Sequence, residues 1–318
     1  MTKDYSSILF SPEEIGNLGH AYLERRREHK GLGIPLYLKS LDEVILPMFP
    51  GELMSIIARP GCGKTGFMMR WARERAKWLR EQNIENRLVV YLTLEQSIEE
   101  LNAFNIASDK RMSLTDMARG EITEAEWKEC LKSAIDRRFV PLWNIGYSSM
   151  TDKKQIKIDV DAINGALNKI TEDGSIVDIL FVDYLQRIPY VSRESKTVGV
   201  SDNLDGLKTI ALRKCPVVTG VQSKREVDTY ADPIPSLDDG QWTSNIEQTS
   251  DRVLSLVRPA KYKKDGEMFG NITVQGHCQM LVSVLKQKLG KDNMAKWVYF
   301  DPEYNKLDEL EMRYGGSL

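Results

Sequence analysis

Short apolar runs alternate with amphipathic stretches along most of the chain after residue 34. Runs such as VVYLTL and IVDILFVD are continuously apolar, which is typical of parallel strands that helices bury on both faces. The runs predict strands at residues 54–58, 88–94, 140–145, 177–183, 216–221, 252–257, 280–286 and 297–300. The stretches between them predict helices at residues 66–82, 97–107, 123–138, 159–172 and 203–214. The pattern therefore predicts an α/β fold in which helices flank a mostly parallel central sheet, with some antiparallel strands at its C-terminal edge.

Polar stretches between these elements mark the expected loops and turns. Residues 192–201 and 228–242 contain Ser or Pro among charged side chains, and they are candidates for mobility and ligand contact. The last strands are closely spaced, with candidate turns at residues 261–276 and 290–296. Thr123 and Glu126 match a capping box and predict a helix start there.

The N-terminal segment predicts one amphipathic helix over residues 11–30. Ser11 is a suitable N-cap, and Pro12 follows at the first helical position. Its apolar positions share one face and are Ile15, Leu18, Tyr22 and Leu23. Gly31 and Gly33 then end the helix and separate it from the rest of the chain. A helix of this kind needs a groove for its apolar stripe, either on its own subunit or on a neighbour. We therefore expect residues 1–32 to form a linker helix and residues 33–318 to form the main domain.

Composition places the chain among ordinary soluble globular proteins. It has 318 residues, a net charge of −2, 28% charged residues and 42% hydrophobic residues. That length allows about two domains, or one α/β domain with an appendage. No run of apolar residues is long enough for a membrane span, and the N-terminus lacks the pattern of a signal peptide. Four cysteines stand singly, without metal-binding or redox spacing, which favours a reducing, cytoplasmic location: Cys62, Cys130, Cys215 and Cys278. The nearly balanced charge means that any nucleic-acid-binding surface must be local.

Residues 51–69 carry the clearest chemistry. An apolar strand leads into RPGCGKT, and a segment compatible with a helix follows. This is the order of a phosphate-binding P-loop, although Ala58 stands where the strict pattern has Gly. Gly61 and Gly63 would let backbone N–H groups point at phosphate oxygens, Lys64 would reach the β- and γ-phosphates, and Thr65 would hold Mg²⁺. The expected phosphate-binding residues are Arg59, Pro60, Gly61, Cys62, Gly63, Lys64, Thr65 and Gly66. The simpler alternative is a glycine-rich turn with a chance Lys-Thr.

Three further strands end in polar side chains. Asp183 ends IVDILFVD and suits a carboxylate in the Mg²⁺ shell, or it merely ends a buried strand. Glu95 ends VVYLTLE and could activate a water molecule, or it could lie at a helix N-cap. Gln222 ends PVVTGVQ and could sense the γ-phosphate, or it could be a loop amide. The carboxyl ends of parallel strands are the ligand-binding edge of an α/β sheet, so we expect these side chains to meet the P-loop.

Longer motifs resemble the motor domain of DnaB-like replicative helicases. The matching pieces occur in family order and are PGELMSIIARPGCGKTGFMM, VVYLTLEQS, VDILFVDYLQRI, CPVVTGVQSKREVD, NIEQTSDRVLSLVRP and LKQKLG. The D-Y-L-Q after the strand ending at Asp183 and the I-E-Q-x-x-D of residues 246–251 are more specific than the P-loop, and the resemblance covers about residues 11–302. It implies a RecA-like P-loop NTPase fold that hydrolyses ATP with Mg²⁺. It also implies a ring, usually hexameric, with nucleotide between neighbouring subunits and single-stranded DNA in the centre.

The resemblance also implies roles for individual residues. Glu95 would be the catalytic base, and Gln222 would be the sensor. Residues 11–30 would be the linker helix that docks on the adjacent subunit. Lys286 and Lys288 in LKQKLG match the positions that supply charge to the neighbour's nucleotide.

Several positions depart from the family pattern. The family usually has Arg at the position of Lys288, and Lys lacks the planar fork of the guanidinium. A phosphate-contacting Arg of the family is matched here by Phe104. No counterpart of the N-terminal collar domain that recruits primase is expected, which leaves a loader or a primase as a further candidate partner.

Contacts with DNA are expected from two segments. Lys224 and Arg225, directly after Gln222, could face the channel or form a solvated charged pair. The central loop reads Gln-Trp-Thr-Ser instead of the usual Arg-Glu-Ser-Gly, and its candidate DNA-binding residues are Gln241, Trp242 and Ser244. Trp242 could equally pack on its own domain.

Two functions follow from these features. The first is an ATP-dependent DNA helicase or translocase. The second is a RecA-like ATPase that acts as a nucleotide-controlled switch or assembly factor without unwinding, which the lysine at position 288 and the diverged central loop would favour.

Overall fold

The computed structural model describes residues 9–28, 33–136, 140–151, 154, 156–190, 195–241, 245–270 and 272–310. The strands within these ranges are β1 (Leu53–Ala58), β2 (Arg87–Thr93), β3 (Leu142–Ile145), β4 (Ile176–Asp183), β5 (Val217–Gln222), β6 (Arg252–Val257), β7 (Met268–Phe269), β8 (Ile272–Thr273), β9 (Gln279–Gln287), β10 (Met294–Asp301) and β11 (Lys306–Glu309). The α-helices are α1 (Pro12–Glu28), α2 (Lys39–Asp42), α3 (Lys64–Glu81), α4 (Ile98–Lys110), α5 (Leu114–Arg119), α6 (Glu124–Asp136), α7 (Val160–Ile170), α8 (Lys196–Arg213) and α9 (Ile246–Thr249). Short 3-10 helices are η3 (Leu185–Arg187), η4 (Arg225–Thr229), η5 (Leu237–Asp239) and η6 (Pro259–Lys261).

One twisted sheet organises the domain. In the described residues it has nine strands in the order β11-β10-β9-β6-β1-β5-β4-β2-β3. The strands from β6 to β3 are parallel, whereas β9, β10 and β11 are joined in antiparallel fashion at one edge. This confirms the predicted mostly parallel sheet with an antiparallel C-terminal edge. Because β1 lies in the middle, the P-loop that follows it lies between strand tips on both sides.

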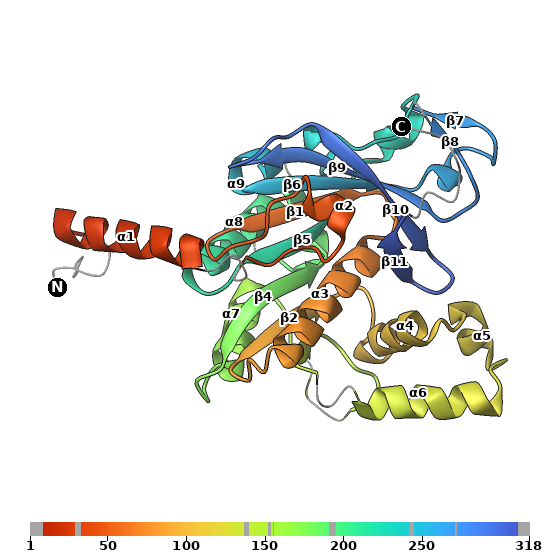
Figure 1. The fold of residues 1–318 in the computed structure, drawn as a ribbon, viewed down its shortest axis with the longest axis horizontal. Helices are drawn as coiled ribbons and strands as arrows, with labels where there is room; N and C mark the ends of the chain where they lie inside the picture. Colours follow the sequence, from red (N-terminus) through yellow and green to blue (C-terminus); the bar gives the residue numbers. More distant parts are fainter. Residues whose placement is uncertain are drawn as a thin grey trace.

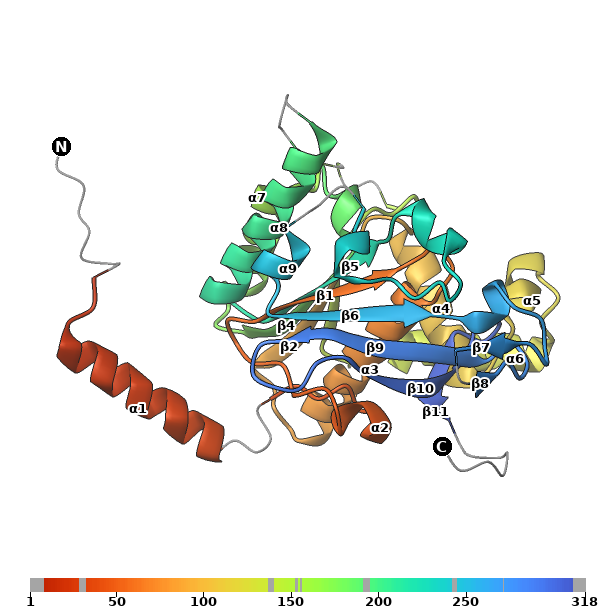
Figure 2. The ribbon, with the colours of Figure 1, turned by 90° about the horizontal axis from the view of Figure 1, so that it is seen from above.

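Helices cover both faces of the sheet (Figures 1 and 2). One core lies between the sheet and α3 with the preceding segment, and the other lies between the sheet and α7 with α8. Strands β1 and β4 are buried along nearly their whole length, as the continuous apolar runs predicted. Arg70 and Trp71 on α3 donate side-chain hydrogen bonds to backbone carbonyls of residues 35–37, which fixes the chain entering the domain against α3.

A buried ion cluster ties α3 to the middle of the sheet. The Asp178 carboxylate accepts from Arg75 Nε and Nη2 and from Arg87 Nη1. Arg75 and Asp178 are both almost fully buried. Removing one partner would leave a buried charge unpaired, which typically costs about 3–5 kcal/mol. The cluster therefore holds the helix that begins at the P-loop in a fixed position on β4.

Differences from the predicted elements are concentrated in polar segments. Residues 196–201 were predicted as part of a loop, but they form the first turns of α8, whose N-cap is Ser195. This prediction was wrong because the first turns lack an apolar periodicity. Gly199 allows Tyr190 to pack there, since a Cβ atom would lie 2.2 Å from its ring. The predicted loop at residues 228–242 contains the short η5 helix, and α5 was not predicted.

Helix α1 projects from the body of the domain (Figures 1 and 2). Ser11 and Glu14 form the expected capping interaction at its start. The predicted apolar face is exposed along its length, from 50% to 66% of each side chain, at Ile15, Leu18, Tyr22 and Leu23. Within the described part of the chain, no helix is both long and apolar enough to cross a bilayer.

Candidate nucleotide-binding site

The P-loop connects the buried strand β1 to α3. Gly61 and Gly63 have φ values of 72° and 90°, which are positive angles that favour glycine. A Cβ atom on Gly63 would also lie 2.5 Å from Met280 and 2.9 Å from Phe300. Both glycines are therefore needed for the turn, and Gly63 is also needed for the close approach of β9 and β10. The loop leads directly into the N-terminus of α3, whose free N–H groups and dipole favour an anion.

Lys64, Thr65 and Asp183 meet at the base of the loop. The Thr65 hydroxyl donates a 2.6 Å hydrogen bond to Asp183 Oδ2, and the Tyr91 hydroxyl donates to the same oxygen at 3.0 Å. Lys64 donates to the Ala58 carbonyl and lies 5.6 Å from the centre of the Tyr184 ring. Burial raises the pKa of Asp183, against the effects of its Thr65 hydrogen bond and the Lys64 charge. Burial lowers the pKa of Lys64, and the Asp183 charge opposes that shift.

The Asp183 carboxylate has a free coordination position. Its Oδ1 atom is buried, and no described residue donates a hydrogen bond to it. An unpaired buried carboxylate oxygen is costly unless a cation or water binds it. A hard cation such as Mg²⁺ prefers carboxylate, hydroxyl and phosphate oxygens. The described residues contain no group of three or more His, Cys, Asp or Glu side chains that could hold a metal by themselves. The residues thus fit an ion that arrives together with phosphate oxygens.

A cavity of about 310 Å³ opens above the P-loop. Glu95 and Gln222 line it from the tips of β2 and β5, together with Lys64 and Thr65. The four predicted strand tips therefore come together at one edge of the sheet. Glu95 is the sole carboxylate among the described residues that line the cavity. The N-cap of α4 is Ser97, in a capping box with Glu100, so Glu95 is not the residue that caps this helix.

Arg59 and Cys62 are held behind the loop. The Arg59 guanidinium binds the Asp228 carboxylate in a bidentate manner, with bonds of 2.8–3.0 Å, and donates to the Ser223 carbonyl. Cys62 is buried, and neither side chain is among the described residues lining the cavity. Their backbone groups remain candidates for phosphate contact. Lys261 donates to the Pro60 carbonyl from outside, which helps to hold the loop in shape.

The far wall of the cavity comes from residues that the sequence patterns did not single out. Arg258 follows β6, donates to the Gly61 carbonyl at 3.1 Å and lies 5.5 Å from the Phe300 ring centre. Phe300, Pro302 and Asn305 close the same side. Phe104 also lines the cavity, where the family pattern has a cation. Arg258 thus brings a guanidinium to a cavity in which residue 104 carries no charge.

Lys286 and Lys288 lie at the opposite edge of the sheet. Gln287 pairs with Arg252, and Arg252 pairs with Met54 at the start of β1, whereas the P-loop follows the end of β1. The length of this strand separates them, roughly 15–20 Å. Neither lysine can therefore reach the P-loop of its own subunit.

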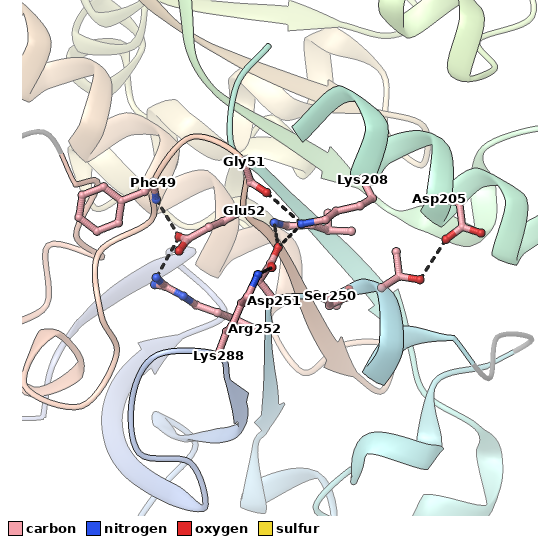
Figure 3. A network of polar contacts seen from close by, with 12 residues as sticks. Phe49, Gly51, Glu52, Asp205, Lys208, Ser250, Asp251, Arg252 and Lys288 are labelled. Carbon is pink, nitrogen blue, oxygen red and sulfur yellow. Dashed lines mark hydrogen bonds and ion pairs between the residues drawn. The ribbon is translucent and has the colours of Figure 1, made fainter. Parts of the chain in front are cut away.

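A polar network holds the two lysines (Figure 3). Asp251 accepts from the Leu53 backbone N–H, from Lys208 and from Lys288, the last at 3.3 Å. Lys286 donates to the carbonyls of Glu247 and Ser250 at the end of α9. Lys288 keeps 65% of its side chain exposed, so it is the freer of the two.

The candidate DNA-binding residues follow Gln222 and η5. Lys224 donates to the Asp238 carbonyl, and Arg225 begins η4 with an exposed side chain. Gln241 is tied to β5 through its backbone, since its N–H donates to the Gln222 carbonyl at 2.8 Å. Trp242 and Ser244 lie outside the described residues.

The fold and site define a class before any relative is considered. A central strand, a glycine-bearing loop and Lys-Thr at a helix start, with a carboxylate at a neighbouring strand tip, are the features of a RecA-like P-loop NTPase. The chain belongs to the DnaB-like helicase C terminal domain family, whose model matches residues 33–309.

Curated relatives and solved structures agree with this family. The chain is 26% identical over 322 residues to the replicative DNA helicase DnaB of Rickettsia bellii (strain RML369-C), covering 95% of this chain and 62% of that protein. It is 26% identical over 291 residues to DnaB of Geobacillus stearothermophilus, covering 91% and 59%. The chain therefore spans about 60% of the length of these relatives. Similar solved structures are an isolated ATPase domain (TM-score 0.76, 20% identity, 95% and 100% coverage) and a DnaB-like replicative helicase studied with primase (TM-score 0.75, 21% identity, 93% and 66% coverage).

Proposed function

We propose that this chain is an ATP-driven DNA helicase or translocase that works as a ring, with nucleotide bound between subunits and single-stranded DNA in the centre. One observation carries the proposal. Lys64 with Thr65, Glu95, Asp183 and Gln222 come from four separate strand tips to one edge of the sheet, around one cavity. Family membership supports DNA as the substrate.

The described residues divide the work of ATP hydrolysis. Gly61, Gly63 and the start of α3 would hold the phosphates, and Lys64 would neutralise charge that develops on them. Thr65 and Asp183 would hold Mg²⁺, which supplies charge neutralisation at the phosphates when bound. Glu95 would take a proton from the attacking water, and Gln222 would contact the γ-phosphate. Phe300 and Arg258 offer an aromatic ring and a guanidinium to the base and sugar.

A single subunit leaves this site without a trans-acting cation. Lys288 lies at the amino edge of the sheet, on the side away from its own P-loop. A head-to-tail contact would bring that edge of one subunit to the nucleotide of the next, and such contacts close into rings. We propose that Lys288 supplies the charge in trans, while Lys286 supports α9 at the same interface.

Helix α1 and helix α6 offer complementary surfaces for assembly. The apolar face of α1 has no cover among the described residues. Trp127, Leu131 and Ile135 form a second exposed stripe on one face of α6, each about half exposed. Four-residue spacing places them in line on that helix. We propose that α1 of one subunit docks on the α6 region of its neighbour, as the linker-helix interpretation of residues 1–32 requires.

Polar substitutions in either stripe should weaken assembly. Leu18→Ser and Leu131→Ser each remove apolar area whose full burial is worth about 1.5–3 kcal/mol per side chain. Both variants should shift the ring to smaller species at higher protein concentration in sedimentation velocity runs, with an unchanged monomer melting temperature. Met268→Ser, at an equally exposed apolar residue on β7, is the control and should assemble normally. Unchanged assembly in both stripe variants would contradict the docking of α1 on α6.

Strand displacement on forked DNA tests the proposed activity directly. We expect ATP-dependent separation of the strands from a fork with one of the two single-stranded tails, and ATP hydrolysis that single-stranded DNA accelerates. Forks with either a 5′ or a 3′ tail are needed because polarity does not follow from the site. Robust ATP hydrolysis that no nucleic acid changes would instead support the nucleotide-controlled switch. A loader or a primase is a further proposed partner, since one of the similar structures is that of a helicase studied for its interactions with primase.

A further inference from the structure

Gln186 joins three functional segments through its amide. It belongs to the D-Y-L-Q motif and lies three residues after Asp183, in η3. Its Nε2 atom donates to the Gln222 carbonyl at 3.3 Å and to the Gln241 carbonyl at 2.9 Å. Its Oε1 atom accepts from the Gln222 N–H at 3.1 Å. One side chain thus bonds both backbone groups of the γ-phosphate sensor and the residue that precedes the central loop.

The base of this clamp is fixed in the core. Leu185 and Ile188, on either side in η3 and after it, are fully buried. Asn203 on α8 donates to the Ile188 carbonyl at 2.9 Å and holds the end of the same segment. Gln186 is itself 8% exposed, so its three hydrogen bonds are shielded from water and costly to lose. The clamp therefore moves with β4 and Asp183 rather than with the surface loops.

The segments that Gln186 binds are also paired with each other. Gln241 N–H donates to the Gln222 carbonyl, and Lys224 N–H donates to the Asp239 carbonyl, both at 2.8 Å. Ser223 and Gly240 form an antiparallel bridge between them. On its other side, the Ser223 N–H donates to the carbonyl of Ala58, where the P-loop begins. A shift of the β5 tip is thus transmitted by hydrogen bonds to Gln241, and from there to residues 242–244.

We propose that Gln186 is a positioning residue that couples the nucleotide state at Gln222 to the DNA-contacting loop. This inference rests on the proposed function, because it needs residues 241–244 to contact DNA. When Gln222 gains or loses the γ-phosphate, the short ladder of residues 222–224 and 239–241 pivots on Gln186. Gln186 touches neither nucleotide nor DNA in this scheme, and it acts through the backbone of its two partners.

Nucleotide-dependent DNA affinity measures the coupling. In the wild-type ring, the Kd for an oligo-dT strand should differ between a non-hydrolysable ATP analogue and ADP by about 5- to 150-fold, the usual range of allosteric coupling. Gln186→Leu keeps the size of the side chain and removes all three hydrogen bonds, so the ratio should fall to about one. Asn203→Leu is the matched control, since it removes a buried amide from the same segment without touching Gln222 or Gln241. It should lower the melting temperature and keep the ratio. A wild-type ratio in a folded Gln186→Leu ring would overturn the proposal.

Hydrogen exchange on the wild-type ring gives a readout that does not depend on the variant folding. Amides of residues 239–241 should change their exchange rate when the ATP analogue replaces ADP, in the absence of DNA. An unchanged rate would overturn the clamp. If the wild-type ring does not bind DNA in either state, the proposed function fails, and the exchange result alone decides whether Gln186 links the sensor to this segment.

Discussion

Lys64→Ala should lower the rate of ATP hydrolysis by about 10²–10³-fold, the usual cost of removing one preorganised charge contact from an active site. The ammonium lies at the base of the cavity between the Ala58 carbonyl and the Asp183 charge. Its removal takes away the positive charge nearest the P-loop backbone and leaves Asp183 without that counterion. Steady-state phosphate release at saturating ATP measures the effect. Lys77→Ala, which removes a half-exposed lysine from the same helix, is the control and should keep its rate.

Glu95→Gln separates binding from chemistry at the same site. The substitution keeps the shape of the side chain and removes the sole carboxylate among the described residues that line the cavity. A fluorescent ATP analogue should bind with near wild-type affinity, while hydrolysis falls by about 10²–10⁴-fold, the usual contribution of a general base. A Glu95→Gln ring that still turns over ATP at the wild-type rate would place the base elsewhere. Loss of nucleotide affinity in this variant would instead assign Glu95 a binding role.

The P-loop half of the cavity could be predicted because strand direction places it. Glu95, Asp183 and Gln222 each follow a buried apolar run, and parallel strands bring their carboxyl ends to one edge. Arg258 follows the same rule, since it comes directly after β6. It was missed because only carboxylates and amides at strand tips were considered as candidates, and the cation after the sixth strand was not.

The opposite wall depended on the antiparallel edge. Strand β9 reverses direction relative to β6, and β10 reverses again, so the end of β10 returns to the P-loop edge. Phe300 reaches the cavity for this reason, and its ring accounts for Gly63 and Gly66, whose Cβ atoms would clash with it. Local sequence patterns show hairpins but not which face or edge they return to. The role of Gln186 was hidden for a similar reason, because its partners are 36 and 55 residues away.

Lys288→Ala should lower ATP hydrolysis by about 10³-fold in the assembled ring, the lower end of the range for a cation supplied in trans, because Lys lacks the planar fork of Arg. The side chain is mostly exposed and is tethered to Asp251, which Lys208 and the Leu53 N–H also bind. Asp251 therefore keeps two partners when Lys288 extends toward a neighbour, so the release of Lys288 leaves no buried charge unpaired. Lys288→Arg should keep or raise the rate. Lys291→Ala, an exposed lysine in the same turn, is the control and should not change it.

Mixing two inactive variants tests whether Lys288 acts on the neighbouring subunit. A Lys64→Ala subunit still carries Lys288, and a Lys288→Ala subunit still carries an intact P-loop. In an equimolar random ring, about a quarter of the head-to-tail interfaces pair an intact P-loop with an intact Lys288. The mixture should therefore recover a measurable fraction of wild-type hydrolysis, although each variant alone has almost none. No recovery, in rings shown by sedimentation to contain both subunits, would mean that Lys288 does not act in trans. The separation of Lys288 from its own P-loop by the length of β1 would then make it an interface residue that binds Asp251 and takes no part in the chemistry.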